Sequence, residues 1–341
     1  MGFGGPQNLE AVAPMLERVM GSPPPPSVVA SVQEKYAAIG GASPVVPIAQ
    51  AICKQLQTAL QESELAEHVQ HVQPGMCFTE PCIQDGLTKL ADARCERIIC
   101  LAMTPYESWA AWDGPAQRVR SEAATLGIDQ VLTAPVFGLS DAYVSGHVQH
   151  IITALKKLVS SPSFDGKSCE IIFAAHSLPL EDAHETASQY QAQFEQAGKT
   201  VVAKLEHFRV QTSFAYTSVG VRGGKWLGPD LDDELVRLAT EGVTSVVVCP
   251  LGFATDHMEV LYDIDIDAVE KARSLGMNFT RTPTLATIPT TFSDSCQSAP
   301  SVIPAFEPGS WRPESCSASA QINPALTNAM MNSIRKVLRD D

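Results

Sequence analysis

Apolar runs and amphipathic segments alternate along most of the chain, and this alternation gives the first indication of its fold. The segments 169–175 and 244–250 contain continuous apolar runs, at 171–175 and 246–249, that include β-branched side chains, as expected for strands buried on both faces. Shorter runs predict further strands, and segments with helical periodicity separate them. The expected strands lie near 69–72, 97–103, 130–134 and 208–215, and the expected helices near 7–20, 28–39, 47–63, 141–160, 181–198, 230–241, 256–275 and 324–339.

This order of elements predicts an α/β protein with two Rossmann-like lobes, each a parallel sheet flanked by helices, and an active-site cleft between them. The N-terminal lobe is expected to span 1–138 and the C-terminal lobe 139–285. Ser, Thr and Pro dominate 286–323, which predicts an exposed connector of the disordered type. Residues 324–341 then form a last helix, which we expect to pack back onto the body.

A histidine stands at the end of the first buried strand. The run from 169 to 175 leads into His176, and Pro179 prevents a helix from starting directly after it. His176 is therefore expected at the carboxyl edge of the sheet, where open α/β sheets bind ligands. An imidazole there is suited to accept protons near neutral pH. The alternative is a histidine with a purely structural role, which is the commoner case for a lone histidine.

Acidic residues follow the second buried strand. Asp256 is expected to cap a helix, and Glu259, three residues later, to complete a capping box. Along that helix Glu259, Asp263 and Asp267 recur every four residues, so three carboxylates lie on one face. This row is either a solvated acidic face or a site that moves protons and a metal ion.

Five short motifs are spread from residue 4 to residue 263. They are Gly4-Gly5-Pro6, Tyr36-Ala37-Ala38-Ile39-Gly40-Gly41-Ala42-Ser43-Pro44, Ala175-His176-Ser177-Leu178-Pro179, Trp226-Leu227-Gly228-Pro229-Asp230 and the segment from Gly252 to Asp263. In this order they closely resemble the ferrochelatase family, whose members insert ferrous iron into a porphyrin to make haem. Such a match is more specific than a likeness of fold.

The resemblance implies roles for the candidate residues. A free porphyrin must lose two pyrrole protons before iron can sit among its four nitrogens. His176 would accept these protons on one face of the ring, and Glu259 would act from the other face, delivering metal or carrying protons away. Metal contacts are expected from His176, Glu259, Asp263 and Asp267. The two aspartates are expected to form a relay from solvent to Glu259, because carboxylates hold divalent iron loosely enough to pass it on.

The residues expected to hold the porphyrin lie in the other motifs. Gly4 and Gly5 allow close backbone approach, and Ser43 can donate a hydrogen bond to a propionate. Trp226 is expected to stack on the ring, and Phe3 to lie beside it. The alternative interpretation is that the glycines form ordinary turns and that the indole belongs to the core.

Two departures from the family bear on which porphyrin is bound. Phe3 stands where some relatives that act on coproporphyrin carry a tyrosine. Arg18 and Lys35 stand in the region where some of those relatives have paired arginines. Because a tetracarboxylate needs more cations than a dicarboxylate, the sequence slightly favours protoporphyrin IX over coproporphyrin III.

Composition narrows the class of partner. The formal net charge of −14 argues against nucleic acid, whose phosphates need a basic surface, and against electrostatic attachment to an anionic membrane. It favours the concentration of cations such as ferrous iron. No apolar run reaches the roughly 20 residues of a membrane span, and residues 1–20 show no export signal.

Nine cysteines without a CxxC motif are typical of a reducing compartment, so we expect a cytoplasmic protein. Some ferrochelatases carry an iron–sulfur cluster near the C-terminus, which needs four cysteine ligands. Only Cys296 and Cys316 occupy that region. We therefore expect no cluster, and no cofactor beyond the substrate iron.

Two histidine pairs have a spacing that brings them together on a helix, His68 with His71 and His147 with His150. Neither pair has a third ligand nearby in the sequence, whereas a metal site needs one. All four are therefore expected to be surface histidines.

The start of the chain departs from the family. An apolar strand normally leads into Gly4-Gly5-Pro6, whereas here only Met1-Gly2-Phe3 precede it. We expect either that the true start lies upstream or that this strand is very short.

Two other functions are open from the sequence. One is a cobalt chelatase of the same superfamily, although its relatives usually present two histidines. The other is a tetrapyrrole- or metal-binding protein without turnover. The combination of His176 with Glu259 favours catalysis over both.

Overall fold

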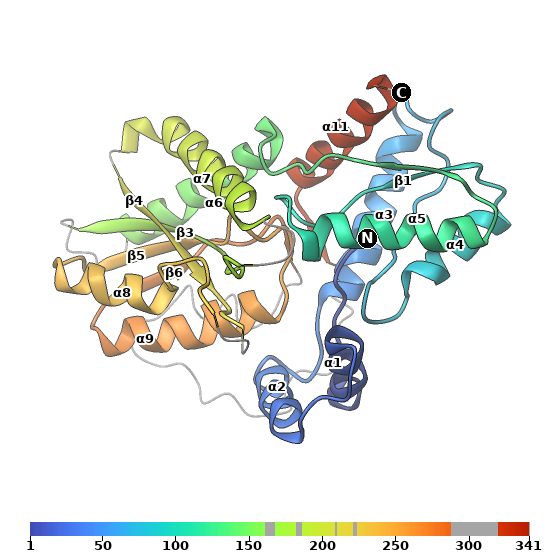
Figure 1. The fold of residues 1–341 in the computed structure, drawn as a ribbon. Helices are drawn as coiled ribbons and strands as arrows, with labels where there is room; N and C mark the ends of the chain where they lie inside the picture. Colours follow the sequence, from blue (N-terminus) through green and yellow to red (C-terminus); the bar gives the residue numbers. More distant parts are fainter. Residues whose placement is uncertain (161–167, 182–185, 209, 221–223, 288–319, 341) are drawn as a thin grey trace.

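The computed structural model describes residues 1–160, 168–181, 186–208, 210–220, 224–287 and 320–340. Two α/β lobes lie side by side, with a small helical hairpin projecting from the N-terminal one (Figure 1). Each lobe contains a parallel sheet with helices packed against it, which confirms the predicted fold class.

The sheet of the C-terminal lobe has the strand order β4-β3-β5-β6, all parallel. Its strands are β3 (Cys169–His176), β4 (Gln211–Thr217), β5 (Ser245–Cys249) and β6 (Asn278–Arg281). Its helices are α6 (Asp141–Val159), α7 (Ala187–Lys204), α8 (Leu231–Thr240), the π-helix η4 (Glu259–Ala268) and α9 (Val269–Ser274). β3 and β5 correspond to the two long apolar runs and lie next to each other.

Successive residues of β3 and β5 face opposite layers of helices, as the period of two requires. Ile171, Phe173 and Val247 belong to a core shared with α6 and α7. Ile172 and Val246 belong to a second core, with α8, η4 and α9. All five side chains are fully buried, so both faces of the sheet are covered and a continuous apolar run is the sequence that such strands need.

The N-terminal lobe contains a smaller sheet, in which β1 (Arg97–Cys100) pairs in parallel with β2 (Gln130–Thr133). Its helices are η1 (Leu9–Ala11), α1 (Val12–Met20), α2 (Pro26–Ala38), α3 (Val45–Gln61), α4 (Ile83–Asp92), the π-helix η2 (Trp109–Asp113) and α5 (Gly114–Thr125). α1 and α2 form the projecting hairpin (Figure 1). The last helix, α11 (Pro324–Asp340), packs on α3 of one lobe and α6 of the other, as expected of a helix that returns to the body.

Some elements differ from the expectations. Residues 69–72 form no strand, although their pattern predicted one. The helix expected from 256 begins at Glu259 as a π-helix, and α4 and α5 were not predicted. Of the connector expected over 286–323, the two ends form the short antiparallel pair β7 (Ala286–Thr287) and β8 (Gln321–Ile322). Residues 288–319, with Cys296 and Cys316, lie outside the described residues.

No helix in the described part of the chain is long and apolar enough to cross a membrane.

The turn after β5 depends on a glycine. The Gly252 nitrogen donates a hydrogen bond to the Ala174 carbonyl at 2.9 Å. A Cβ added at Gly252 would lie 2.4 Å from the Ala175 Cβ and 2.6 Å from its Cα. This close approach brings the segment that follows β5 against the end of β3.

We expect Gly252→Ala to lower the free energy of unfolding by about 1–3 kcal/mol, because the turn must move away from Ala175. Urea denaturation measures this change. Gly276→Ala is the matched control: its φ of +73° is strained for alanine, but no atom lies within 4 Å of the added Cβ. Both variants should lose stability, and Gly252→Ala should lose more, because only its added Cβ meets another part of the chain. An equal loss in the two variants would show that the contact with Ala175 does not constrain this turn.

Candidate active site

His176 ends β3 and is half-buried. Its Nδ1 lies 2.5 Å from the Ser177 carbonyl oxygen. Because a carbonyl only accepts hydrogen bonds, Nδ1 carries the hydrogen, and in the neutral ring the lone pair is on Nε2. Ser177 is held in turn, since its hydroxyl donates to the Leu227 carbonyl at 2.7 Å. The main chain thus presents His176 as a base through one defined nitrogen.

Glu259 lies near His176 and is paired with a second histidine. His257 Nδ1 is 2.7 Å from a carboxylate oxygen of Glu259, and both side chains are partly exposed, 20% and 28%. Burial alone would raise the pKa of Glu259. The charge and hydrogen bond of His257, together with the charge of His176, outweigh burial and lower this pKa to about 2. Glu259 is therefore an anion at neutral pH.

A buried ion cluster lies at the base of η4. Arg281 on β6 contacts Asp265 through Nε at 2.5 Å and Nη2 at 2.8 Å, and its Nη1 is 3.5 Å from Asp256. Asp256 also accepts a hydrogen bond from the Thr284 hydroxyl at 2.9 Å. It is thus held from β6 and does not cap a helix, and η4 has no side-chain cap. The expectation of a capping box formed by Asp256 and Glu259 was wrong.

The other two carboxylates of the row differ in their exposure. Asp263 is 11% exposed, and its two oxygens contact Lys35 Nζ, at 3.0 Å, and the Ser218 hydroxyl. Asp267 is exposed. Burial and the charge of Asp263 raise the pKa of Asp267, whereas Lys35 opposes them. Lys35 also lies 4.8 Å above the Tyr262 ring. The row therefore ends in solvent at Asp267, and a cation from α2 occupies its buried middle.

Four of the residues expected to hold a porphyrin belong to the N-terminal lobe. Phe3 is 46% exposed and contacts Phe78 with the rings tilted by 52° and their centroids 4.5 Å apart. Gly4 has a φ of +98°, and a Cβ there would meet the Thr79 hydroxyl at 2.3 Å. A Cβ on Gly5 would meet the Ser43 hydroxyl at 2.2 Å. Ser43 is thus buried against Gly5, and these glycines have a packing role that is independent of any ligand.

Trp226 lies close to the His176 segment. It forms a β-bridge with Pro179, and Leu227 N donates to the Leu178 carbonyl at 2.9 Å. A Cβ on Gly220 would meet the indole at 2.5 Å. The loop after β3 and the loop that carries Trp226 therefore form one unit.

Three participants were missed by sequence reasoning. His257 is two residues from Glu259, a spacing at which side chains do not face each other on an α-helix. Lys35 reaches Asp263 from 228 residues away. Ser218 has a φ of +65°, which is unusual outside glycine. No local pattern reports either of the last two, because both are set by the packing of α2 and β4 against η4.

The predictions for the two histidine pairs had different outcomes. His68 and His71 are exposed, as expected. The expectation for His147 and His150 was wrong: His147 is fully buried, with Nδ1 3.6 Å from the Cys249 sulfur, and burial lowers its pKa to about 3. His150 Nδ1 is 3.0 Å from the Pro283 carbonyl. Both face the core because α6 lies between the sheet and α11.

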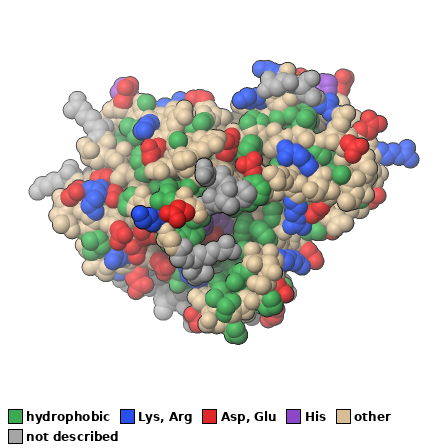
Figure 2. Space-filling view, in the orientation of Figure 1, with side chains coloured by type: hydrophobic (Ala, Val, Ile, Leu, Met, Phe, Trp, Pro, Cys, Tyr) green, Lys and Arg blue, Asp and Glu red, His purple; other side chains and the backbone are tan. Residues whose placement is uncertain are grey.

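Among the described residues, no three His, Cys, Asp or Glu side chains form a group that could hold a metal ion. Figure 2 shows a hollow at the centre of the molecule, above the α1–α2 hairpin, with histidine side chains visible inside it.

The chain is similar to several known proteins. A family model described as Ferrochelatase matches residues 1–293. The coproporphyrin III ferrochelatase of Propionibacterium freudenreichii subsp. freudenreichii is 32% identical over 295 residues, which cover 84% of this chain and 82% of that protein. The ferrochelatase of Herpetosiphon aurantiacus is 29% identical over 282 residues, 82% of this chain and 90% of that protein. Among solved structures, a sirohydrochlorin chelatase of Bacillus subtilis subspecies spizizenii in complex with cobalt matches with a TM-score of 0.49 and 11% identity, over 84% of this chain and 90% of that one.

Proposed function

Because this chain belongs to the ferrochelatase family, we propose that it inserts ferrous iron into coproporphyrin III in the cytoplasm. The reaction is a lyase step of haem biosynthesis that releases two protons. The observation that carries the chemistry is the pairing of an imidazole, whose Nε2 has a free lone pair, with an ionised carboxylate nearby. Free thiols on the seven described cysteines support a reducing compartment.

His176 and Glu259 have different roles in the removal of the pyrrole protons. As a pyrrole N–H bond breaks, its electron pair stays on nitrogen for donation to iron, and His176 Nε2 accepts the proton. This happens twice, with transfer of each proton to solvent in between. Glu259 supplies a negative charge that attracts ferrous iron and stabilises the protonated imidazole. His257 keeps this carboxylate ionised, and a neutral carboxyl would do neither task.

The choice of porphyrin follows the relatives. Several similar proteins of 29–32% identity are named coproporphyrin III ferrochelatases. This favours the tetracarboxylate over protoporphyrin IX, which the sequence had slightly favoured. One cation stands where a propionate can reach it: Arg18 is exposed, and its guanidinium donates to the Phe78 carbonyl at 3.1 Å, beside Phe3. Lys35 is engaged with Asp263.

The test compares the two porphyrins directly. Purified protein is mixed without oxygen with Fe(II) and either coproporphyrin III or protoporphyrin IX, and the visible spectrum follows insertion. We expect a kcat/KM at least about tenfold higher for coproporphyrin III, because its additional carboxylates can form charge-assisted hydrogen bonds. A preference for protoporphyrin IX would overturn the choice of substrate, and binding without insertion would overturn the reaction.

For the acidic row we propose a relay in which Asp267 and Asp263 pass hydrated iron to Glu259. Asp267 is exposed and Asp263 is nearly buried, which supports Asp267 as the residue that meets solvent first. For this transfer the ion pair between Lys35 and Asp263 must open, so that Asp263 can bind iron in place of Lys35. Removing the charge of Asp263 therefore tests the relay. Asp263→Asn should raise the apparent KM for Fe(II) by about tenfold and leave the KM for porphyrin nearly unchanged, since an amide binds a divalent cation less well than a carboxylate.

Steady-state kinetics with each substrate varied in turn measures both constants. Asp233→Asn, on α8, is the matched control and should leave both unchanged. If the Asp263/Asp267 double variant shows the same iron dependence as the unaltered protein, the row is only a charged surface and the relay does not exist.

A further inference from the structure

Two buried tyrosine hydroxyls, one from each lobe, hold the start of the segment that leads to Glu259. The Leu251 carbonyl accepts a hydrogen bond from the Tyr143 hydroxyl at 3.0 Å and another from the Tyr106 hydroxyl at 3.2 Å. Tyr143 lies on α6, in the same lobe as Leu251, whereas Tyr106 follows β1 of the N-terminal lobe. The N-terminal lobe is thus bonded, through Tyr106, to the main chain that carries the proposed carboxylate.

Both phenol groups depend on this carbonyl. Tyr106 and Tyr143 are 0% exposed, and a buried hydroxyl without a partner is costly. A carbonyl oxygen has two lone pairs, so Leu251 can accept both hydrogen bonds. Burial also raises the pKa of each phenol well above its usual value. Each hydroxyl therefore stays protonated and remains a donor.

A third buried tyrosine connects the same contact to the strand that ends at His176. The hydroxyl of Tyr190, on α7, forms a hydrogen bond with the main chain of His176. Its ring meets the Tyr106 ring edge-on, with centroids 5.9 Å apart and an angle of 83° between the planes. Tyr106 is therefore linked to β3 through Tyr190 and to the segment after β5 through Leu251.

The neighbours of Tyr106 in the chain also contact both lobes. Glu107 N donates to the side chain of Gln193 at 2.8 Å, and Gln189 donates to the Glu107 carboxylate, both from α7. On the other side Gly138, in the connection between β2 and α6, packs against the phenol ring. A Cβ added at Gly138 would lie 2.4 Å from Cε1 of Tyr106. The ring has little room to move, so its hydroxyl is held in one place.

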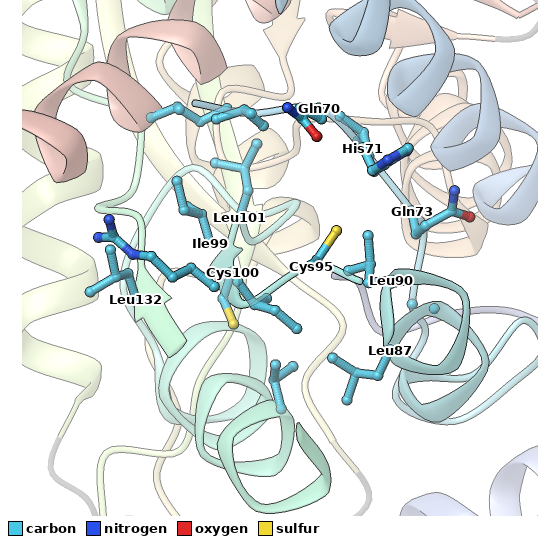
Figure 3. A pocket seen from close by; sticks show the side chains of 18 of the residues that line it. Gln70, His71, Gln73, Leu87, Leu90, Cys95, Ile99, Cys100, Leu101 and Leu132 are labelled. Atoms are coloured by element: carbon cyan, nitrogen blue, oxygen red, sulfur yellow. The ribbon is translucent and has the colours of Figure 1, made fainter. Parts of the chain in front are cut away.

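This contact is separate from the cavity of the N-terminal lobe. That cavity has a volume of about 410 Å³ and lies between residues 69–75 and β1 (Figure 3). Its lining includes Ile99 and Leu101 but neither Tyr106 nor Leu251. A substitution at Tyr106 therefore does not act by filling or enlarging the cavity.

We propose that Tyr106 is a positioning residue for iron insertion, whose hydroxyl sets the segment from Leu251 to Glu259 relative to His176 and to the N-terminal lobe. This rests on the proposed function, in which His176 and Glu259 act from opposite faces of a porphyrin. Their separation must then match the ring, and catalysis falls steeply when reacting groups are displaced by a fraction of an ångström. Tyr106 acts through Leu251 and does not touch the reacting atoms.

The test removes one hydroxyl at a time and keeps the ring. Tyr106→Phe should lower kcat for Fe(II) insertion into coproporphyrin III by at least about tenfold and change the porphyrin KM by less than about threefold. Tyr143→Phe is the matched variant, because it removes a hydrogen bond to the same oxygen from within the C-terminal lobe. It should lower kcat by less than about threefold. The thermal midpoints of the two variants should fall by similar amounts, so a loss of stability alone cannot explain a difference in kcat.

Hydrogen exchange gives a readout that does not depend on turnover. Tyr106→Phe should speed exchange by at least about threefold in both 104–109 and 251–256, because its hydroxyl joins these two segments. Tyr143→Phe should speed exchange in 251–256 and leave 104–109 unchanged.

The outcomes separate this proposal from the proposed function. Equal losses of kcat in the two variants, or a normal kcat in Tyr106→Phe, would overturn the positioning role while the unaltered protein still inserts iron. Exchange that changes in only one of the two segments in Tyr106→Phe would overturn the link between the lobes. An unaltered protein that inserts no iron would overturn the proposed function itself.

Discussion

We expect His176→Ala to lower the turnover number for iron insertion by at least about 100-fold while the porphyrin Kd changes by less than about tenfold. In the proposed mechanism the imidazole acts on the pyrrole protons as they leave, so its loss removes stabilisation of the transition state rather than of the bound porphyrin. Nε2 is the nitrogen concerned, because the Ser177 carbonyl engages Nδ1. Turnover is followed anaerobically by absorbance, and binding by porphyrin fluorescence.

The matched control is His207→Ala, which removes an exposed imidazole from the short 3-10 helix after α7 and should leave turnover unchanged. Added imidazole should restore part of the activity of His176→Ala, since a small base can enter the space left by the side chain. A variant with near-normal turnover would remove His176 from the mechanism.

The second large effect is expected for Glu259→Gln, which keeps the shape of the side chain and removes its charge. We expect turnover to fall by about 100-fold, with a smaller change in the KM for porphyrin, because iron and the protonated His176 both lose their counter-charge. Glu270→Gln, on the exposed side of α9, is the control. Equal turnover in the two variants would contradict the role of Glu259.

The lowered pKa of Glu259 can be tested through the pH dependence of activity. It is lowered from 4.5 to about 2, so the carboxylate stays ionised above pH 4 and cannot cause an acid limb in that range. Removing the partner in His257→Asn leaves burial as the larger influence, which raises this pKa. We expect a new loss of activity below about pH 6 in this variant. A pH profile that keeps its shape would show that His257 does not control Glu259.

The lowered pKa of Glu259 also affects the free energy of unfolding. A carboxylate with a lowered pKa in the folded protein stabilises the fold above its unfolded pKa, and this contribution is lost as the pH falls from 4.5 towards 2. Glu259→Gln should therefore be less stable than the unaltered protein at pH 7, and the difference should disappear near pH 2. Urea midpoints at the two pH values measure it.

The core of the C-terminal lobe could be predicted from the sequence. β3 and β5 are buried on both faces, and only a continuous run of apolar side chains suits that environment, so the run itself reports the strand. The place of His176 follows from the end of β3 and from Pro179. Motif order was sufficient to suggest the family.

Elements whose structure depends on contacts with distant parts of the chain could not be predicted in the same way. Residues 69–72 have a strand pattern but form no strand, because a strand needs a neighbour and the cavity lies beside them. η4 has the apolar spacing of an α-helix, and nothing local distinguishes its i→i+5 hydrogen bonds. The sequence predicted His147 and His150 to be surface residues, because it does not show that α6 packs between the sheet and α11.

The sequence by itself determined where the candidate residues stand: an imidazole after one buried strand and a row of carboxylates after another. Only the tertiary structure decided their protonation and charge states. His257 lowers the pKa of Glu259, and Lys35 neutralises Asp263 from a helix 228 residues away. Electrostatic energy depends on distance and solvent exposure rather than on order along the chain. Residue types can therefore be read from the sequence, whereas their charge states are set by the fold.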